Sequence, residues 1–238
     1  MSNFQIDPYR TGDPALNRLK QIVAPNSAVI DVGGGAGRYA LPLSYQCKQI
    51  TVVEPADSMV DALNETMRAE SIQNVTAMQM PWEEADLEAV DVVLSAHSVY
   101  GVPHIEPFIR KLEAKATGIV VLFVYVDQPG SVHSSLWKPV YGEERVDLPA
   151  LRNFMNVLWE MDIYASLEML EAVPPVPFTS REVALEQIGH SLFIAPGSIE
   201  ERKLNDAIDD FLVQSGDGVL LKYAKPRRLG IITWVGHA

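Results

Sequence analysis

One stretch decides the fold of this 238-residue chain, and it reads Val29-Ile30-Asp31-Val32-Gly33-Gly34-Gly35-Ala36-Gly37. A short apolar run passes through an acidic residue, and glycines then stand at alternate positions. Glycine adopts backbone dihedrals that are closed to other residues, and it lets a backbone approach a ligand without a Cβ in the way. A helix predicted over 38–46 would present unpaired N–H groups toward the same place. The stretch therefore predicts a strand, a loop and a helix that bind a nucleotide-like cofactor.

Two kinds of cofactor fit this loop, and the position of its carboxylate separates them. Read from Gly35, the residues follow the G-x-G-x-x-G/A pattern of dinucleotide sites, with Glu54 about twenty residues further on as a ribose acceptor. Read from Asp31, they follow D-x-G-x-G-x-G. A carboxylate there attracts a cationic group and repels a pyrophosphate by on the order of 1 kcal/mol or more at a partly buried site. The charge favours a cofactor with a cationic end.

The run from Asp31 resembles the first motif of class I S-adenosylmethionine (AdoMet) methyltransferases, and the resemblance extends over residues 28–128. It implies that AdoMet lies along Gly33, Gly35 and Gly37, with its amino-acid end near Asp31. Glu54 matches the family's acid that accepts hydrogen bonds from both ribose hydroxyls. The resemblance also implies cofactor contacts at Pro55, Met59, Met80, Trp82 and Ala96. Ordinary core packing is the alternative for Met80 and Trp82.

Candidate catalytic residues follow the fourth predicted strand, which covers 90–95. His97 is expected at the carboxyl end of the sheet, where open α/β sheets bind ligands, and Tyr100 lies in the same turn. Either side chain could accept a proton from an acceptor or orient it, and a purely structural role is the alternative for both. His97 and His104 have no third ligand nearby in the sequence, so no metal site is predicted.

Composition limits the partners. The formal charge of −12 counts against nucleic acid, whose binding depends largely on neutralising phosphates. We expect no membrane span, and the polar start Met1–Gln5 does not resemble a secretory signal, so a cytoplasmic location is expected. The single cysteine, Cys47, excludes an internal disulfide and is expected to be a buried, inert thiol. We interpret the basic run Lys222–Arg228 as a solvated connection between strands.

Alternating strands and helices predict an α/β fold, namely a Rossmann-like, doubly wound sheet of seven mostly parallel strands with an antiparallel last strand. Strands are predicted at 28–32, 49–54, 74–78, 90–95, 118–126, 164–172, 218–224 and 229–235, and helices at 13–23, 38–46, 56–70, 105–115, 149–162, 180–193 and 199–215.

The chain is predicted to be a single domain, 1–238, whose cofactor-binding half is 1–128. Two segments, 129–148 and 174–217, exceed what the minimal fold needs, and long connections are usually functional or disordered. We expect them to form a helical cap, with Trp137, Tyr141 and Phe178 lining an apolar pocket. Covering one face of the sheet, or mediating a homodimer, are the alternatives.

The resulting hypothesis is an AdoMet-dependent methyltransferase that acts on a small molecule. A non-catalytic AdoMet-binding regulatory or partner protein fits the same motifs, because they report binding and not turnover. An NAD(P)-dependent oxidoreductase fits the glycine loop, but the chain lacks the Y-x-x-x-K of short-chain dehydrogenases. The residues after the fourth strand also lack the Asn/Asp-Pro-Pro-aromatic motif of relatives that methylate amide or base nitrogens. The sequence specifies neither the acceptor nor the atom that would be methylated.

Overall fold

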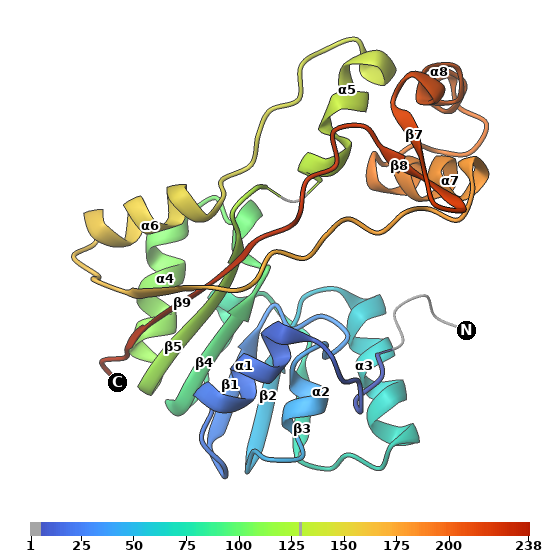
Figure 1. Cartoon of the computed structure of the whole chain (residues 1–238). Helices are drawn as coiled ribbons and strands as arrows, with labels where there is room; N and C mark the ends of the chain where they lie inside the picture. The colour runs from blue at the N-terminus through green and yellow to red at the C-terminus, as the bar shows by residue number, and fades with distance from the viewer. Residues whose placement is uncertain (1–5, 129) are drawn as a thin grey trace. The chain divides into compact units, whose positions relative to one another are not determined.

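The computed structural model describes residues 6–128 and 130–238, and the chain divides into two compact units (Figure 1). The first comprises the chain up to Val124 together with Leu151–Glu171 and Leu229–Ala238. The second comprises Tyr125–Ala150 and Ala172–Arg228, and both predicted insertions fall within it. The polar start of the chain and residue 129 lie outside the described residues.

The main sheet has seven strands in the order β3-β2-β1-β4-β5-β9-β6. Strands β1 to β5 pair in parallel where they are neighbours. β9 runs antiparallel to β6. It also runs antiparallel to β5, because Gly236 N–H donates to Gly118 O at one end and Val126 N–H to Arg228 O at the other. The prediction of a mostly parallel sheet with an antiparallel last strand is confirmed. The strands are β1 (Ala28–Val32), β2 (Gln49–Val53), β3 (Val75–Met78), β4 (Val90–Ala96), β5 (Ala116–Tyr125), β6 (Ser166–Met169) and β9 (Leu229–Val235).

Helices flank this sheet, and the central strands are buried (Figure 1). A parallel strand covered on both faces reads as a continuous apolar run, as β5 does over 120–124, where every side chain is fully buried. Helix α1 begins at Pro14 because Asp13 caps it, accepting hydrogen bonds from the N–H groups of Ala15 and Leu16. The helical elements of this unit are α1 (Pro14–Ile22), α2 (Ala40–Leu43), α3 (Asp57–Ala69), α4 (Ile105–Ala114), α6 (Leu151–Glu160) and the 3₁₀ turns η1 (Trp82–Glu84) and η2 (Val99–Gly101).

The second unit has a hydrophobic core of its own, formed by Leu136, Val140, Ala184, Ile188, Leu192, Leu204, Ile208 and Leu221. Trp137, Tyr141 and Phe178, the aromatic residues predicted to line a pocket, pack against this core. Its elements are η3 (Ser131–His133), α5 (Ser134–Tyr141), α7 (Arg181–Ser191), α8 (Ile199–Ala207), η4 (Ile208–Asp210), β7 (Leu212–Ser215) and β8 (Gly218–Leu221).

One predicted helix is wrong in its second half. Helix 199–215 ends at Ala207, and Leu212–Ser215 forms a hairpin with Gly218–Leu221 instead. The predicted strand 218–224 therefore joins this small two-stranded sheet. Gly216 takes a φ of +59° in the connecting turn, a conformation that glycine permits and that suits a tight hairpin. Among the described residues, no helix is both long enough and apolar enough to cross a membrane.

Candidate functional site

The glycine loop follows β1 at the carboxyl edge of the sheet, and its alternate glycines all have positive φ: +69° at Gly33, +57° at Gly35 and +83° at Gly37. A Cβ at Gly33 would lie 2.4 Å from Ser98 Cβ. A Cβ at Gly35 would meet only Met59 Sδ, at 4.0 Å. The space beside Gly35 is therefore open, and this is where a ligand can lie against the backbone.

Gly37 is constrained by the protein itself. A Cβ there would lie 2.6 Å from Leu63 Cδ1 and 2.8 Å from Leu41 Cγ, both in the core. The first and last of the three glycines thus serve packing as well as turn geometry. The middle one has no such neighbour.

Glu54 joins the end of β2 to the glycine loop. Its Oε2 accepts a hydrogen bond from Gly35 N–H and its Oε1 accepts one from Ala56 N–H, each at 3.0 Å. The side chain is buried, and each carboxylate oxygen retains a lone pair after these bonds. The arrangement leaves Glu54 able to accept two hydroxyl groups beside the open face of Gly35.

Asp31 is a buried carboxylate, 1% exposed, near the end of β1 and just before the glycines. Neither of its oxygens has a hydrogen-bond partner among the described residues. Burial, together with the negative charge of Glu54, raises the pKa of Asp31 to about 7, although the Ala40 N–H opposes the shift. Buried polar groups are nearly always paired in folded proteins, so an orphaned carboxylate calls for a ligand that supplies a donor or a positive charge.

His97 directly follows β4 and lies at the same edge of the sheet. Its φ is +63°, a strained value for a residue with a side chain, and its N–H donates to Phe123 O at 3.1 Å. Its ring centroid lies 6.5 Å from that of Tyr39, beside the loop, and 6.5 Å from that of Phe123. The predicted position of His97 at the carboxyl edge agrees with the structure. Its catalytic role stays a prediction.

Tyr100 lies in η2 and is buried, with its ring 6.2 Å from Phe154 of α6 in an edge-to-face arrangement. Packing accounts for its position, and its catalytic role also stays a prediction. Its neighbour Ser98 links the site strands, because Ser98 Oγ donates to Val32 O at 3.1 Å and hydrogen-bonds to Ser95 Oγ. In the described ranges, no three His, Cys, Asp or Glu side chains are grouped to hold a metal ion.

The remaining predicted cofactor contacts differ in how open they are. Pro55 is exposed directly after Glu54, whereas Met59, Met80 and Ala96 are half-buried. Trp82 is buried: its indole Nε1 lies 3.5 Å from Phe108 O, and the Lys111 ammonium lies 4.8 Å from its ring centroid. Core packing against α4 accounts for this ring. A contact between Trp82 and adenine stays a prediction.

Two arginine side chains lie near the loop, and the sequence pattern does not predict them there. The guanidinium carbons of Arg10 and Arg38 each lie 5.7 Å from the centroid of the Tyr39 ring. Both side chains also reach Asp13 Oδ2, at 3.3 and 3.4 Å. Burial of Asp13 opposes ionisation, but the Leu16 N–H and both arginines lower the pKa of Asp13 overall. Arg10 Nη1 is buried and has no hydrogen-bond partner among the described residues.

Arg10 is far from the glycines along the chain, so no local sequence pattern connects it with the loop. Only the capping pattern Asp13-Pro14 was visible in this region, and it indicates a helix start and not a binding role. The contact between Arg10 and Tyr39 joins the segment before α1 to the residue that precedes α2.

Comparison with protein families identifies the domain. Residues 29–115 match the model of a methyltransferase domain. Over this range, which is a little over a third of the chain, the sequence resembles methyltransferases. The matched range starts in β1 and ends just after α4, so it contains the glycine loop, Glu54 and His97. The resemblance inferred from Asp31 and the glycines is confirmed.

One curated relative and two solved structures show how far this likeness extends. An uncharacterized protein of Haemophilus influenzae is 28% identical over 151 residues, which are 63% of this chain and 55% of that protein. The chain thus spans about half the length of the curated relative it matches. The YcgJ protein of Bacillus subtilis is 14% identical with a TM-score of 0.62, over 94% of this chain and 98% of that one.

The second structure is magnesium protoporphyrin IX methyltransferase of Synechocystis, which was solved with bound S-adenosylhomocysteine. It is 12% identical with a TM-score of 0.56, over 97% of this chain and 91% of that one. At these identities the two structures establish a shared fold.

Proposed function

We propose that this protein transfers a methyl group from AdoMet to a small-molecule acceptor. The observation that carries the proposal is the orphaned Asp31 carboxylate, which lies just before a loop whose Gly35 leaves open space. A buried, unpaired carboxylate suits a cofactor with a cationic amino group and disfavours a pyrophosphate. The fold is shared with a Synechocystis enzyme that holds S-adenosylhomocysteine, which supports the same choice.

The residues of the site match the chemical groups of AdoMet. Asp31 would hold the ammonium group, and the buried Nη1 of Arg10 would donate to the carboxylate at the same end of the cofactor. Glu54 would accept both ribose hydroxyls, and Met59 would contact the adenine from α3. When bound, AdoMet supplies a methyl group on a positively charged sulfur, which needs positioning more than activation.

His97 is our candidate for the proton transfer that an oxygen or nitrogen acceptor requires. Its imidazole lies at the carboxyl edge of the sheet, near Tyr39 and Phe123, where the strands of the cofactor site end. A ring nitrogen there would take the proton as the acceptor is methylated.

Two measurements test the proposal. Isothermal titration with AdoMet and with NADH separates a methyltransferase from an oxidoreductase, and we expect binding of AdoMet alone. Release of S-adenosylhomocysteine in the presence of candidate acceptors separates an enzyme from a non-catalytic AdoMet-binding protein. Preferential binding of NADH would overturn the proposal.

AdoMet affinity is expected to rise about tenfold between roughly pH 5.5 and pH 7. The pKa of Asp31 is raised to about 7, so at lower pH this carboxyl is protonated and loses its attraction for the ammonium group. Titration calorimetry across this range measures the effect. An affinity that is independent of pH would contradict the role of Asp31.

The matched control is Asp31→Asn, which keeps the volume and removes the charge. It should bind AdoMet weakly, with a flat pH profile. Because the folded-state pKa of Asp31 is raised, its contribution to stability is present below the unfolded pKa and is lost as the pH rises through about 7. Asp31→Asn should therefore raise the free energy of unfolding of the ligand-free protein at pH 8 by about 2 kcal/mol. Higher stability with weaker binding distinguishes a functional carboxylate from a structural one.

The two insertions provide a test of the predicted cap. If segments 129–148 and 174–217 close over bound cofactor, hydrogen exchange in 129–148 should slow on addition of S-adenosylhomocysteine. Exchange in helix α4, which lies outside both segments, provides the internal comparison. Unchanged exchange in both segments at saturating ligand would leave them as a separate unit with no part in closing the cofactor site.

A further inference from the structure

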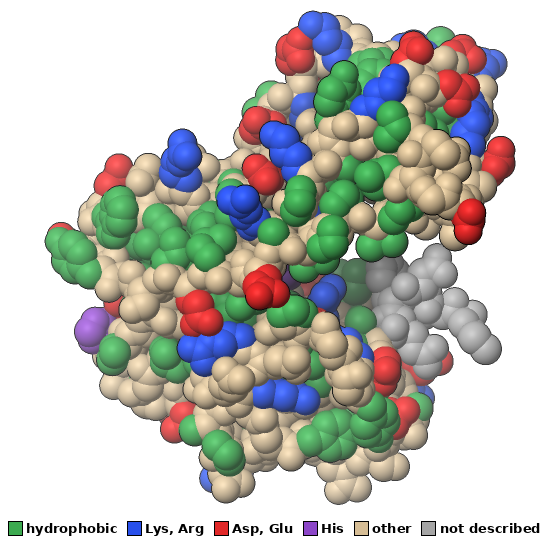
Figure 2. All heavy atoms as spheres, in the orientation of Figure 1, with side chains coloured by type: hydrophobic (Ala, Val, Ile, Leu, Met, Phe, Trp, Pro, Cys, Tyr) green, Lys and Arg blue, Asp and Glu red, His purple; other side chains and the backbone are tan. Residues whose placement is uncertain are grey.

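A cavity of about 670 Å³ lies within the second unit, and positive charge dominates its lining. Four basic side chains line it, together with a single carboxylate, Asp127; the basic residues are Arg145, Lys225, Arg227 and Arg228. The chain as a whole carries a formal charge of −12, and Figure 2 shows acidic and basic side chains interspersed on the visible surface. The concentration of cations around one cavity therefore departs from the character of the rest of the protein. The run 222–228 contributes to a cavity wall and is more than the solvated connection inferred from sequence.

Arg145 is held in place by its surroundings. Its Nη1 donates to Gly130 O at 2.7 Å, and its guanidinium carbon lies 5.3 Å from the centroid of the Trp137 ring. Gly130 has a φ of +77°, a backbone conformation that favours glycine. Gln128, which is buried, accepts from Leu148 N–H at 2.5 Å and thereby ties the segment after Arg145 to the same loop.

Arg227 lies on a second, independent wall. Its guanidinium carbon is 4.0 Å from the centroid of the Tyr125 ring, close enough for a cation–π contact. Its backbone N–H and carbonyl both pair with Val173, at 2.8 Å each, which fixes the strand that carries it. Among the described residues, no ion pair involves Lys225, Arg227 or Arg228. Asp127 is the one carboxylate among the four basic side chains in the described lining, so the lining keeps a net positive charge.

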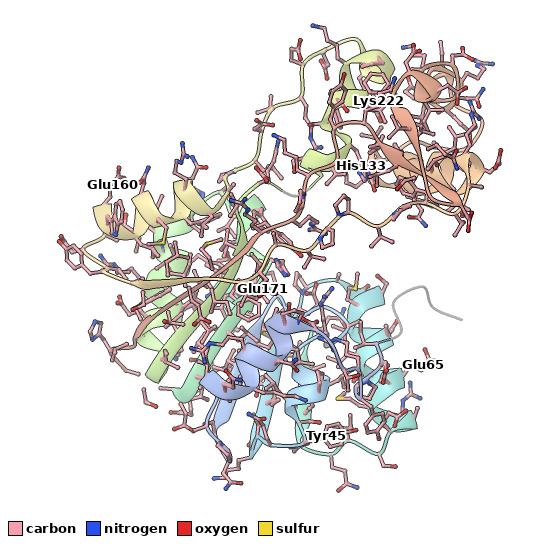
Figure 3. The ribbon with its side chains drawn as sticks, in the orientation of Figure 1. Tyr45, Glu65, His133, Glu160, Glu171 and Lys222 are labelled. Carbon is pink, nitrogen blue, oxygen red and sulfur yellow. The ribbon has the colours of Figure 1, made fainter. Side chains whose placement is uncertain are left out.

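His133, labelled in Figure 3, lines the same cavity as Arg145 and Arg227. Burial, the positive charge of Arg145 and that of Arg227 all lower the pKa of His133, in that order of effect. Both guanidinium groups therefore act on the same imidazole. Its Nδ1 is buried and has no hydrogen-bond partner among the described residues.

We propose that this cavity binds the carboxylate or phosphate group of an anionic small molecule. The anion site stands on the geometry of the second unit and does not depend on the proposed function. Guanidinium groups pair with planar carboxylates and with phosphates through two parallel hydrogen bonds, and arginines fixed in advance lose little freedom on doing so. The ring of Tyr125 supports the guanidinium group of Arg227, and both residues line the cavity.

The test measures the binding of benzoate, phenyl phosphate and neutral benzamide to the full-length protein by ligand-observed NMR. We expect the two anions to bind at least about tenfold more tightly than benzamide, and more weakly as salt is raised. The stronger of the two anions identifies the group as carboxylate or phosphate. Equal binding of benzamide would overturn the proposal.

The decisive variant is Arg227→Gln, and the matched control is Arg202→Gln, an exposed arginine of α8 that does not line the cavity. Arg227→Gln should weaken anion binding by about tenfold or more, and Arg227→Lys should restore part of it. Arg202→Gln should leave it unchanged, and thermal unfolding verifies that the variants fold. If both variants lost the same affinity for the anions, the effect would come from the overall charge of the protein, and the proposed site would be overturned.

AdoMet titration of the same variants separates the two proposals. Arg227→Gln should bind AdoMet as the parent protein does, because the residues proposed to hold AdoMet do not line this cavity. Loss of AdoMet binding in this variant would overturn an anion site that is distinct from the cofactor site. Failure of the parent protein to bind AdoMet, with benzoate still bound, would overturn the methyltransferase function and leave the anion site intact.

Discussion

Replacing Gly35 by valine is expected to abolish AdoMet binding while the protein remains folded. The valine side chain would occupy the open space beside the loop, where its first carbon meets only Met59 Sδ at 4.0 Å. The backbone φ of +57° adds strain for a β-branched residue, of about 1–3 kcal/mol. Calorimetric titration with AdoMet measures the binding, and circular dichroism establishes that the variant is folded.

Gly216→Val provides the matched control for backbone strain. Gly216 has a φ of +59° in the β7–β8 turn, and a Cβ there would meet nothing within 4 Å. This variant carries the same conformational strain at a distance in the sequence from the loop, so it should lose stability but not AdoMet affinity. Normal AdoMet binding by a folded Gly35→Val protein would show that the loop is a structural turn only.

Glu54→Ala is expected to lower AdoMet affinity by about ten- to a hundredfold, which corresponds to roughly 1.5–3 kcal/mol for charge-assisted hydrogen bonds. Two effects combine in this loss. The ribose hydroxyls lose their acceptors, and Gly35 N–H and Ala56 N–H lose the bonds that hold the loop to the end of β2. The measurement is again a titration with AdoMet.

Two further variants separate these effects and provide a control. Glu54→Gln keeps one oxygen acceptor and removes the charge, so its loss should be smaller. Removing that charge should also lower the pKa of Asp31, since Glu54 contributes to its rise. Glu65→Ala alters an exposed residue on α3 and should have no effect on binding. An affinity within about twofold of the parent in a folded Glu54→Ala protein would remove Glu54 from the site.

The sequence determined the sheet and the place of the cofactor loop, because both depend on local chemistry. Buried parallel strands are continuous apolar runs, and the alternate glycines after Asp31 can be read without knowing their neighbours. The distance along the chain from the loop to the end of β2 likewise identified Glu54 in advance.

The sequence predicts elements less accurately where the local signals are weaker. The sequence predicts a helix over 199–215 and a strand over 218–224. In the structure, β7 and β8 form a hairpin instead. Its Gly216 turn is a local signal for a hairpin, but the acidic, polar run before it suits a helix equally well. Pairing between the two short strands settles the structure.

Only the tertiary structure decided which side chains share one environment. The raised pKa of Asp31 requires burial and the nearness of Glu54, and the pairing of Arg10 with Tyr39 requires the segment before α1 to lie beside the residue that precedes α2. The cationic cavity joins Arg145 and Arg227, which lie 82 residues apart (227 − 145) in a chain whose composition is acidic. Electrostatic effects depend on distance and burial in space, and neither quantity can be read from the order of residues.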